Sequence, residues 1–288
     1  MCTPSTATAP DVPILRILSL AAGVIVFVAQ DVIIKLLSGT YPLHEMLFIR
    51  CITGVPFVLA IAIAQRNPAA FRVHRAGIAR GVLHFISFSC YYLALAVLPI
   101  AEVTTLYYAN PLFITALSVP LLGDTVGLRR WAAVLVGFAG VVVVLQPDTG
   151  TLDPAMLVAL RAAFTYALSM LVTRKAGRQV PATGFALHSI AILLVLSSLA
   201  GLAIGDGRLD PGDDVGLGYL LRAWSFPRGL DLVLLAATGP ISAVGFLLLA
   251  QAYRVAPPSL VTPFEFSSLP VAVLTGYLFF GDLPASDR

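Results

Sequence analysis

The chain carries two related stretches, Leu121-Leu122-Gly123-Asp124 and Phe279-Phe280-Gly281-Asp282, and each ends a long apolar run with a glycine and an aspartate. Upstream, Leu93–Ala96 and Leu249–Ala252 stand in corresponding places, each before a turn marked by proline. The two copies align only with small gaps, so the similarity is weak. Internal repetition in an apolar chain is typical of membrane transporters that are built from two related halves.

Composition restricts the class of protein. Hydrophobic residues make up 58% of the 288 residues, charged residues only 11%, and the mean hydropathy is +0.92. A soluble domain carries about 25% charged residues, so this chain has too little polar surface for a globule and is predicted to be an integral membrane protein. The net charge of +3 comes from arginines near the ends of apolar runs, which argues for membrane topology and against a nucleic-acid partner.

The N-terminus and the cysteines add two expectations. Residues 1–13 lack the basic start, the apolar run and the cleavage site of a signal peptide, so we expect a short disordered cytoplasmic tail. Cys2, Cys51 and Cys90 are scattered, and two of them lie in apolar runs, so a disulfide framework is not expected.

A helix needs about 20 apolar residues to cross the hydrocarbon core of a bilayer, and nine runs of the sequence meet this requirement. The longest connection, 205–229, is acidic, and its residues from Tyr219 to Trp224 form either a short interfacial helix or part of an irregular loop. The predicted spans are 14–38, 43–64, 77–98, 101–122, 129–146, 154–175, 181–204, 230–253 and 257–280.

Lysine and arginine set the orientation, because the cytoplasmic loops of membrane proteins are enriched in both. With the N-terminus inside, eleven basic residues fall on the inner side and four on the outer side. The inner set is Arg16, Arg66, Arg72, Arg75, Arg80, Arg129, Arg130, Arg174, Lys175, Arg178 and Arg254, and the outer set is Arg208, Arg222, Arg228 and Arg288. The distribution therefore predicts a cytoplasmic N-terminus.

This orientation turns the repeat into an inversion. The first Gly-Asp pair follows the fourth span and is cytoplasmic, whereas the second follows the ninth span and is external. A repeat unit of five spans must enter the membrane from opposite sides in its two copies, so the halves are predicted to be inverted repeats, at 14–148 and 154–288. A tenth span is expected after Asp282. Either the sequence is truncated, the interpretation that we favour, or this protein lacks that helix.

The motifs together resemble the EamA-type drug/metabolite transporter superfamily. The segments that carry the resemblance are Tyr91–Ala96, Asn110–Phe113 and the two Gly-Asp pairs, although the family often has glutamate where this chain has aspartate. The resemblance covers essentially the whole chain. It implies an all-α, multi-pass secondary transporter of the bacterial inner membrane, with two inverted five-helix repeats, no cofactor, a small-molecule substrate and a monomeric or weakly dimeric state. The aromatic spans look most similar to bacterial exporters of aromatic and other neutral amino acids.

Charge inside a span costs roughly 2.5–3.5 kcal/mol, so each instance needs a reason. Counted from the outer ends of the spans, several polar and aromatic residues lie about 10 Å deep. Arginine can grip a carboxylate, and aromatic rings stack on ligands. Alternatively, Asp31 pairs with Lys35 or with Arg50, and the tyrosines only pack. The predicted substrate-binding layer contains Asp31, Arg50, Tyr91, Tyr92, Tyr107, Tyr108, Asn110 and Arg161.

Helical spacing adds candidates from the inner half. His84, Ser87 and Tyr91 fall on one helical face, so His84 and Ser87 join the substrate-binding set. Pro111 and Pro270 occupy corresponding places in the two halves. Such prolines point to a site near the midplane, or they only kink their helices.

Ionisable residues of the inner half are candidates for gating or proton coupling. Glu265, His84 and His188 lie seven or eight residues from the inner ends of their spans. Membrane glutamate and histidine can relay protons; the alternative is a hydrogen-bonding role at an inner gate.

The predicted function is therefore transport of a small organic metabolite by alternating access, with outward movement of amino acids as the main hypothesis. The alternative is import of another metabolite, such as a vitamin or a nucleotide-like compound. An enzyme is not indicated, because metal-ligand spacing, a nucleophile elbow and a phosphate loop are all missing from the sequence. A purely structural membrane protein would not need a buried layer of arginine, tyrosine and glutamate.

Overall fold

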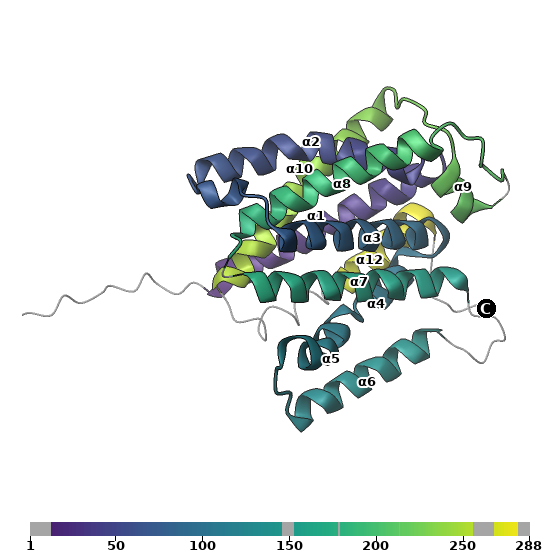
Figure 1. Cartoon of the computed structure of the whole chain (residues 1–288). Coiled ribbons are helices and arrows are strands. Elements are labelled where there is room, and N and C mark those ends of the chain that lie inside the picture. The colour runs from purple at the N-terminus through teal and green to yellow at the C-terminus, as the bar shows by residue number, and fades with distance from the viewer. Residues whose placement is uncertain (1–12, 146–152, 178, 213, 256–267, 282–288) are drawn as a thin grey trace, which may run out of the picture.

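The chain folds into a bundle of apolar helices (Figure 1). The structure, a computed structural model, describes residues 13–145, 153–177, 179–212, 214–255 and 268–281, and within these it contains no strand. Five of the described helices are long and apolar enough to cross a membrane. The all-helical membrane fold expected from the sequence is confirmed.

The helices follow the predicted spans to within a few residues. Only the second part of the predicted span 257–280 can be compared, because 257–267 lies outside the described residues. The helices are α1 (Pro13–Ser38), α2 (Leu43–Ala64), α3 (Arg75–Val97), α4 (Ile100–Tyr107), α5 (Asn110–Leu122), α6 (Leu128–Leu145), α7 (Pro154–Ala176), α8 (Ala182–Ile204), α9 (Val215–Leu221), α10 (Leu230–Val255) and α12 (Ser268–Phe280), with a 3₁₀ turn η1 (Pro68–Phe71) after α2.

The two glycines of the repeated motif perform the same local task. Gly123 follows α5 with φ 73°, and Gly281 follows α12 with φ 69°. In both cases the glycine N–H donates to the carbonyl four residues earlier, at Val119 and Tyr277. A left-handed residue at this position ends a helix, and glycine adopts that conformation without a steric penalty. The motif is therefore a pair of matching helix ends.

The predicted span 101–122 is one crossing built from two helices. α4 ends at Tyr107 and α5 begins at Asn110. The Asn110 side chain donates to the carbonyl of Tyr107 at 2.9 Å, which satisfies a backbone group that the break would leave open. Pro111 lies in the first turn of α5, where its missing N–H costs nothing. Pro270 lies in α12 (Ser268–Phe280), directly after residues 256–267, which lie outside the described residues.

Helices of the two predicted halves pack in matching pairs. In the two predicted halves, α1 corresponds to α7, α2 to α8, α3 to α10, and the pair α4–α5 to α12. Under this correspondence, the α1–α10 contact becomes the α7–α3 contact, and the α3–α8 contact becomes the α10–α2 contact. The α2–α8 and α4–α12 contacts map onto themselves. A two-fold axis between the halves requires such an exchange, in agreement with inverted repeats. α6 packs beside α4 and α5 at the edge of the bundle (Figure 1).

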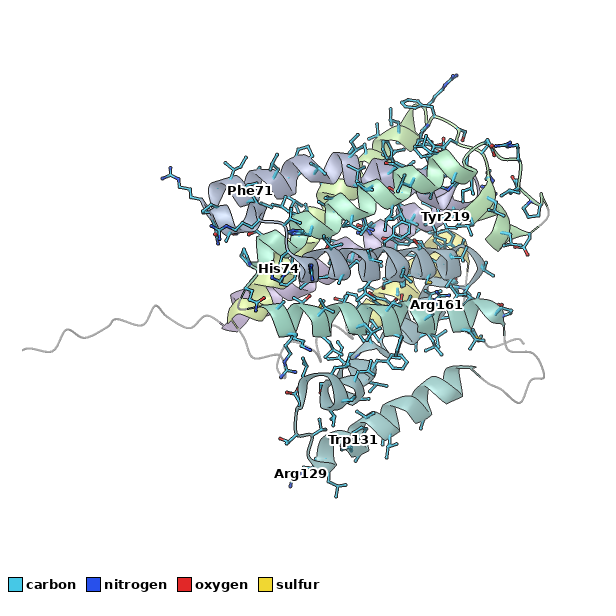
Figure 2. All side chains as sticks on the ribbon, viewed as in Figure 1. Phe71, His74, Arg129, Trp131, Arg161 and Tyr219 are labelled. Atoms are coloured by element: carbon cyan, nitrogen blue, oxygen red, sulfur yellow. The ribbon has the colours of Figure 1, made fainter. Side chains whose placement is uncertain are left out.

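The long connection 205–229 is folded over one end of the bundle. α9 covers part of it, beginning earlier than the expected helix and ending before Trp224. The Trp224 ring packs against Gly201 of α8 and against His44 and Phe48 of α2, and Arg222 donates to the carbonyl of Gly39 at 2.6 Å. Figure 2 shows Tyr219 at this end and Phe71 and His74 at the opposite end.

Candidate functional site

Four buried polar side chains from four helices form a closed ring of hydrogen bonds. Gln30 of α1 donates to the Tyr92 hydroxyl of α3 at 2.6 Å. Arg50 of α2 donates to the same hydroxyl through Nη1 and to the Ser242 hydroxyl of α10 through Nε, the latter at 2.9 Å. The single O–H of Ser242 has two acceptors within hydrogen-bonding distance, the side-chain oxygen of Gln30, which closes the ring, and the backbone carbonyl of Thr238 at 2.6 Å. We call these four residues the polar ring; it ties both predicted halves together.

The polar ring holds Arg50 without using all of its donors. Arg50 is 4% exposed, and its guanidinium lies 4.7 Å from the centre of the Phe88 ring. A guanidinium has five N–H donors in a fixed fork. Among the residues that the structure describes, Nη2 has no hydrogen-bond partner. A buried cation held this way is costly unless its remaining donors are also satisfied, so Arg50 is suited to bind an acceptor group.

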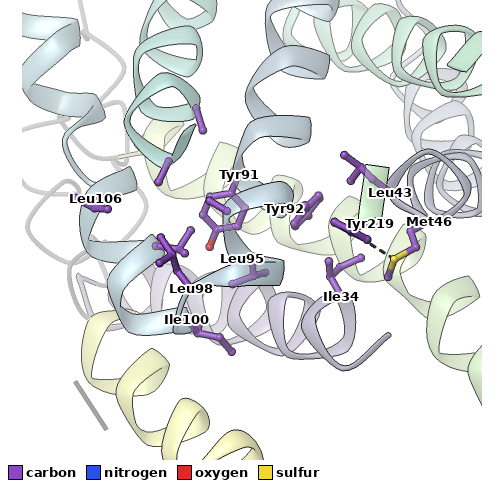
Figure 3. Close-up of a cluster of buried hydrophobic side chains, with 14 of the residues drawn as sticks. Ile34, Leu43, Met46, Tyr91, Tyr92, Leu95, Leu98, Ile100, Leu106 and Tyr219 are labelled. Carbon is purple, nitrogen blue, oxygen red and sulfur yellow. Dashed lines mark hydrogen bonds between the residues drawn. The ribbon is translucent and has the colours of Figure 1, made fainter. Parts of the chain in front are cut away.

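An aromatic cluster lies beside this arginine, which contacts its Phe88 and Tyr92 rings. Along it, the ring centres of Phe88 and Tyr92 lie 6.1 Å apart, those of Tyr92 and Tyr91 5.5 Å, and those of Tyr91 and Tyr107 4.9 Å. Tyr166 continues the cluster, 5.5 Å from Tyr107. His84 closes it, 5.6 Å from Tyr166 and 5.5 Å from Phe88. These six residues, from α3, α4 and α7, are called the aromatic cluster; Figure 3 shows Tyr91 and Tyr92 side by side on α3.

Asp31 lies beside the aromatic cluster. Its carboxylate accepts a hydrogen bond of 2.8 Å from the Tyr91 hydroxyl. Lys35, considered as an alternative partner, instead donates to the backbone carbonyl of Leu98 at 2.8 Å and lies over the Phe280 ring. Arg50 acts on Asp31 through its charge, while its own hydrogen bonds go to the polar ring. Asp31 thus places a carboxyl group at one side of the aromatic residues.

Other residues of the predicted layer serve the helices around the cluster. Ser87 donates to the carbonyl of Ala162 and fixes α3 to α7. Asn110 holds the break between α4 and α5, where Tyr108 also lies. Arg161, assigned to the same layer, is exposed on α7 (Figure 2). Depth alone therefore gathers residues from different faces of a helix.

The inner candidates differ in their surroundings. His188 accepts a hydrogen bond from the His74 backbone N–H at 3.2 Å through Nε2, while Nδ1 contacts the Gly184 carbonyl. Nε2 thus ties α8 to the start of α3, whereas the Nδ1 contact stays within α8, which fits the alternative of a hydrogen-bonding role. Arg80, counted with the cytoplasmic charges, instead donates to Ser189 of α8 at 2.8 Å. Glu265 lies outside the described residues.

Sequence reasoning missed several contributors. Phe88 and Tyr166 belong to the aromatic cluster, and Gln30 and Ser242 belong to the polar ring. Phe88 follows His84 by four residues, so the helical stripe on α3 contained the signal that could have found it. Ser242 stands between Gly239 and Gly245, among mostly small residues, and nothing in the local sequence distinguishes it.

Membrane helices around a buried arginine and an aromatic cluster are suited to a transporter of small organic molecules, and comparison with known proteins identifies this class. The EamA-like transporter family matches residues 14–146, and the chain belongs to this family. It is 30% identical to a riboflavin transporter of Rhizobium johnstonii, over 81% of this chain and 72% of the relative. An S-adenosylmethionine uptake transporter of Rickettsia felis is 25% identical, over 89% and 81%. A pseudopaline exporter of Pseudomonas aeruginosa is 23% identical, over 90% and 85%.

These similarities place the protein among multi-pass membrane transporters and not among enzymes. They also correct the expected similarity to amino-acid exporters. The similar proteins are transporters of riboflavin, S-adenosylmethionine or pseudopaline, and are not specifically amino-acid exporters. Membership of the family is thus confirmed, whereas the finer likeness to amino-acid exporters is not supported.

Proposed function

We propose that this protein imports a metabolite with a flat heteroaromatic ring, of the riboflavin class, across the bacterial inner membrane. The observation that carries the proposal is the aromatic cluster beside Arg50. Two riboflavin transporters, from Rhizobium johnstonii and Vibrio cholerae, are 30% and 32% identical to this chain. The inward direction is supported by the S-adenosylmethionine relatives, which are uptake proteins. Import of a vitamin thus replaces amino-acid export as the main hypothesis.

The residues divide the work of binding. The aromatic cluster offers ring faces and edges, and offset or edge-to-face contacts between rings contribute about 0.5–1.5 kcal/mol each beyond area burial. Nη2 of Arg50 donates to a carbonyl oxygen on the ligand ring. The polar ring keeps the guanidinium in place, so little side-chain freedom is lost when the ligand binds.

A cationic nucleoside-like substrate is the second candidate. Asp31 favours it, since an anion beside aromatic rings can attract a sulfonium or ammonium group. In the described part of the chain, Oδ1 of Asp31 has no hydrogen-bond partner. The S-adenosylmethionine relatives cover 89% of this chain, so this candidate is tested alongside riboflavin.

The transport cycle follows from the matching helix pairs. The two predicted halves, 14–148 and 154–288, rock about the buried site and expose it to each side in turn. The N-terminus is cytoplasmic, and Glu265 remains our candidate for proton coupling. Import down a proton gradient would then accelerate at acidic external pH.

The test is uptake into proteoliposomes with labelled riboflavin, S-adenosylmethionine and phenylalanine. We expect saturable riboflavin uptake that unlabelled S-adenosylmethionine inhibits weakly. Arg50→Lys keeps the charge but removes the fork, so its KM should rise about 10-fold or more, corresponding to roughly 1.5–3 kcal/mol for hydrogen bonds to a charged group. Arg72→Lys, at an exposed position before α3, should leave the KM unchanged. Saturable uptake of phenylalanine alone would refute the proposal.

A further inference from the structure

His84 carries one buried polar atom that has no partner among the residues that the structure describes. The side chain is 1% exposed. Its Nδ1 lies 3.2 Å from the backbone carbonyl of Arg80. Its Nε2 is buried and has no hydrogen bond from any residue that the structure describes. Buried polar atoms in native proteins are nearly always paired, so this atom calls for an explanation.

The hydrogen bond of Nδ1 determines what Nε2 can do. A carbonyl oxygen only accepts, so Nδ1 must carry the proton and donate to Arg80. In the neutral ring the other nitrogen then has a free lone pair and acts as an acceptor. Its missing partner is therefore a donor, an N–H or O–H group.

The surroundings of His84 belong to the site described above. Its ring neighbours are Phe88 and Tyr166, which are members of the aromatic cluster. The ring centre of His84 lies 5.5 Å from that of Phe88, and the Arg50 guanidinium lies 4.7 Å from the centre of the same Phe88 ring, so the histidine and the proposed carbonyl-binding guanidinium share one aromatic neighbour. The acceptor atom of His84 and the cationic donor Arg50 thus both lie next to the aromatic cluster.

We infer that Nε2 of His84 accepts a hydrogen bond from a ring N–H of the substrate, and that the site selects heteroaromatic rings with an unsubstituted imide or lactam N–H. Such a ring carries a carbonyl next to its N–H. The carbonyl suits the free donors of Arg50, and the N–H suits the free acceptor of His84. The isoalloxazine ring of riboflavin has this edge, whereas most amino-acid side chains do not. The inference rests on the proposed function and names the chemical feature that the site recognises.

Methylation of that ring nitrogen provides the test. In reconstituted wild-type protein, riboflavin methylated at the imide nitrogen should inhibit labelled riboflavin uptake at least about 10-fold more weakly than riboflavin itself, because the buried acceptor stays unpaired. In His84→Phe, which keeps a ring in the cluster, the two compounds should inhibit about equally. His84→Gln, whose side-chain oxygen can accept, should restore part of the preference.

The outcomes separate the two proposals. Equal inhibition by both compounds in the wild type, with riboflavin uptake saturable, overturns the role of His84 and leaves the proposed function standing. This result needs no variant, so it holds even if His84→Phe does not fold. An unchanged preference in folded His84→Phe also overturns the role. Absence of saturable riboflavin uptake in the wild type overturns both.

Discussion

The Tyr92 hydroxyl accepts two hydrogen bonds inside the bundle, from Gln30 and from Arg50. All three side chains are at most 4% exposed. The stability of this region therefore depends on one oxygen atom, because neither donor can turn to water when that oxygen is lost.

Tyr92→Phe should destabilise the protein although the ring is kept. Removing the hydroxyl leaves two buried donors unpaired, at about 1–3 kcal/mol for each. We expect a clear drop in the thermal unfolding temperature of the detergent-solubilised protein, measured by intrinsic fluorescence. Tyr277→Phe is the matched control, since Tyr277 on α12 is 54% exposed and should unfold like the wild type. Equal unfolding temperatures for all three proteins would show that the polar ring contributes nothing to stability.

At the residue scale, the sequence indicates which side chains share a level along the helices. It does not indicate the direction in which each side chain points around its helix axis. Tyr91, Tyr92 and Tyr107 were expected at one level, and the structure brings them into one cluster. Arg161 has a similar depth but is exposed on α7. A span that is apolar on every face gives no hydrophobic stripe from which to read its rotation, and the rotation decides which side chains meet.

At the scale of elements, α2 and α10 approach so closely that only glycine fits between them. A Cβ atom on Gly239 would lie 2.2 Å from the Thr53 hydroxyl and 2.5 Å from the backbone nitrogen of Gly54. Gly239 is one helical turn from Ser242, which binds Arg50. The close approach of the two helices is therefore what brings Ser242 within reach of the arginine.

Gly239→Ala should separate α2 from α10 and break the hydrogen bond between Arg50 and Ser242 in the polar ring. The backbone must move, because the clash is with backbone atoms, and such overpacking costs typically 1–3 kcal/mol. We expect a lower unfolding temperature and strongly reduced uptake in proteoliposomes. Gly140→Ala is the control, since a Cβ at that position of α6 meets open space. Wild-type uptake by Gly239→Ala would show that the contact is looser than the geometry indicates.

The break between α4 and α5 is a feature of the helices that hydropathy could not predict. Hydropathy predicted one span over 101–122, and the two helices together do cover one crossing. The proline indicated a disturbance, but the break falls just before it, at Tyr108 and Ala109. What fixes that place is the Asn110 side chain bound to the Tyr107 carbonyl, a contact that hydropathy does not measure.

At the scale of the whole molecule, the matching helix pairs and the two glycine helix ends both support a chain built from two related halves. The contact of α1 with α10 corresponds to that of α7 with α3, across the two halves. The most extensive helix contacts thus join one half to the other, so the two halves form one continuous bundle. In the proposed alternating-access cycle, these contacts between the predicted halves must slide, while the polar ring lies where the halves meet.

The orientation predicted from the basic residues can be tested on the intact molecule. Val73, before α3, is 79% exposed, and Leu209, in the long connection, is 59% exposed. In a background with Cys2, Cys51 and Cys90 replaced by serine, we expect a membrane-impermeant maleimide to label Leu209→Cys in intact cells. Val73→Cys should react only after lysis, because the arginines around it belong on the cytoplasmic side. The reverse pattern would place the N-terminus outside and would require a different explanation for the distribution of arginine.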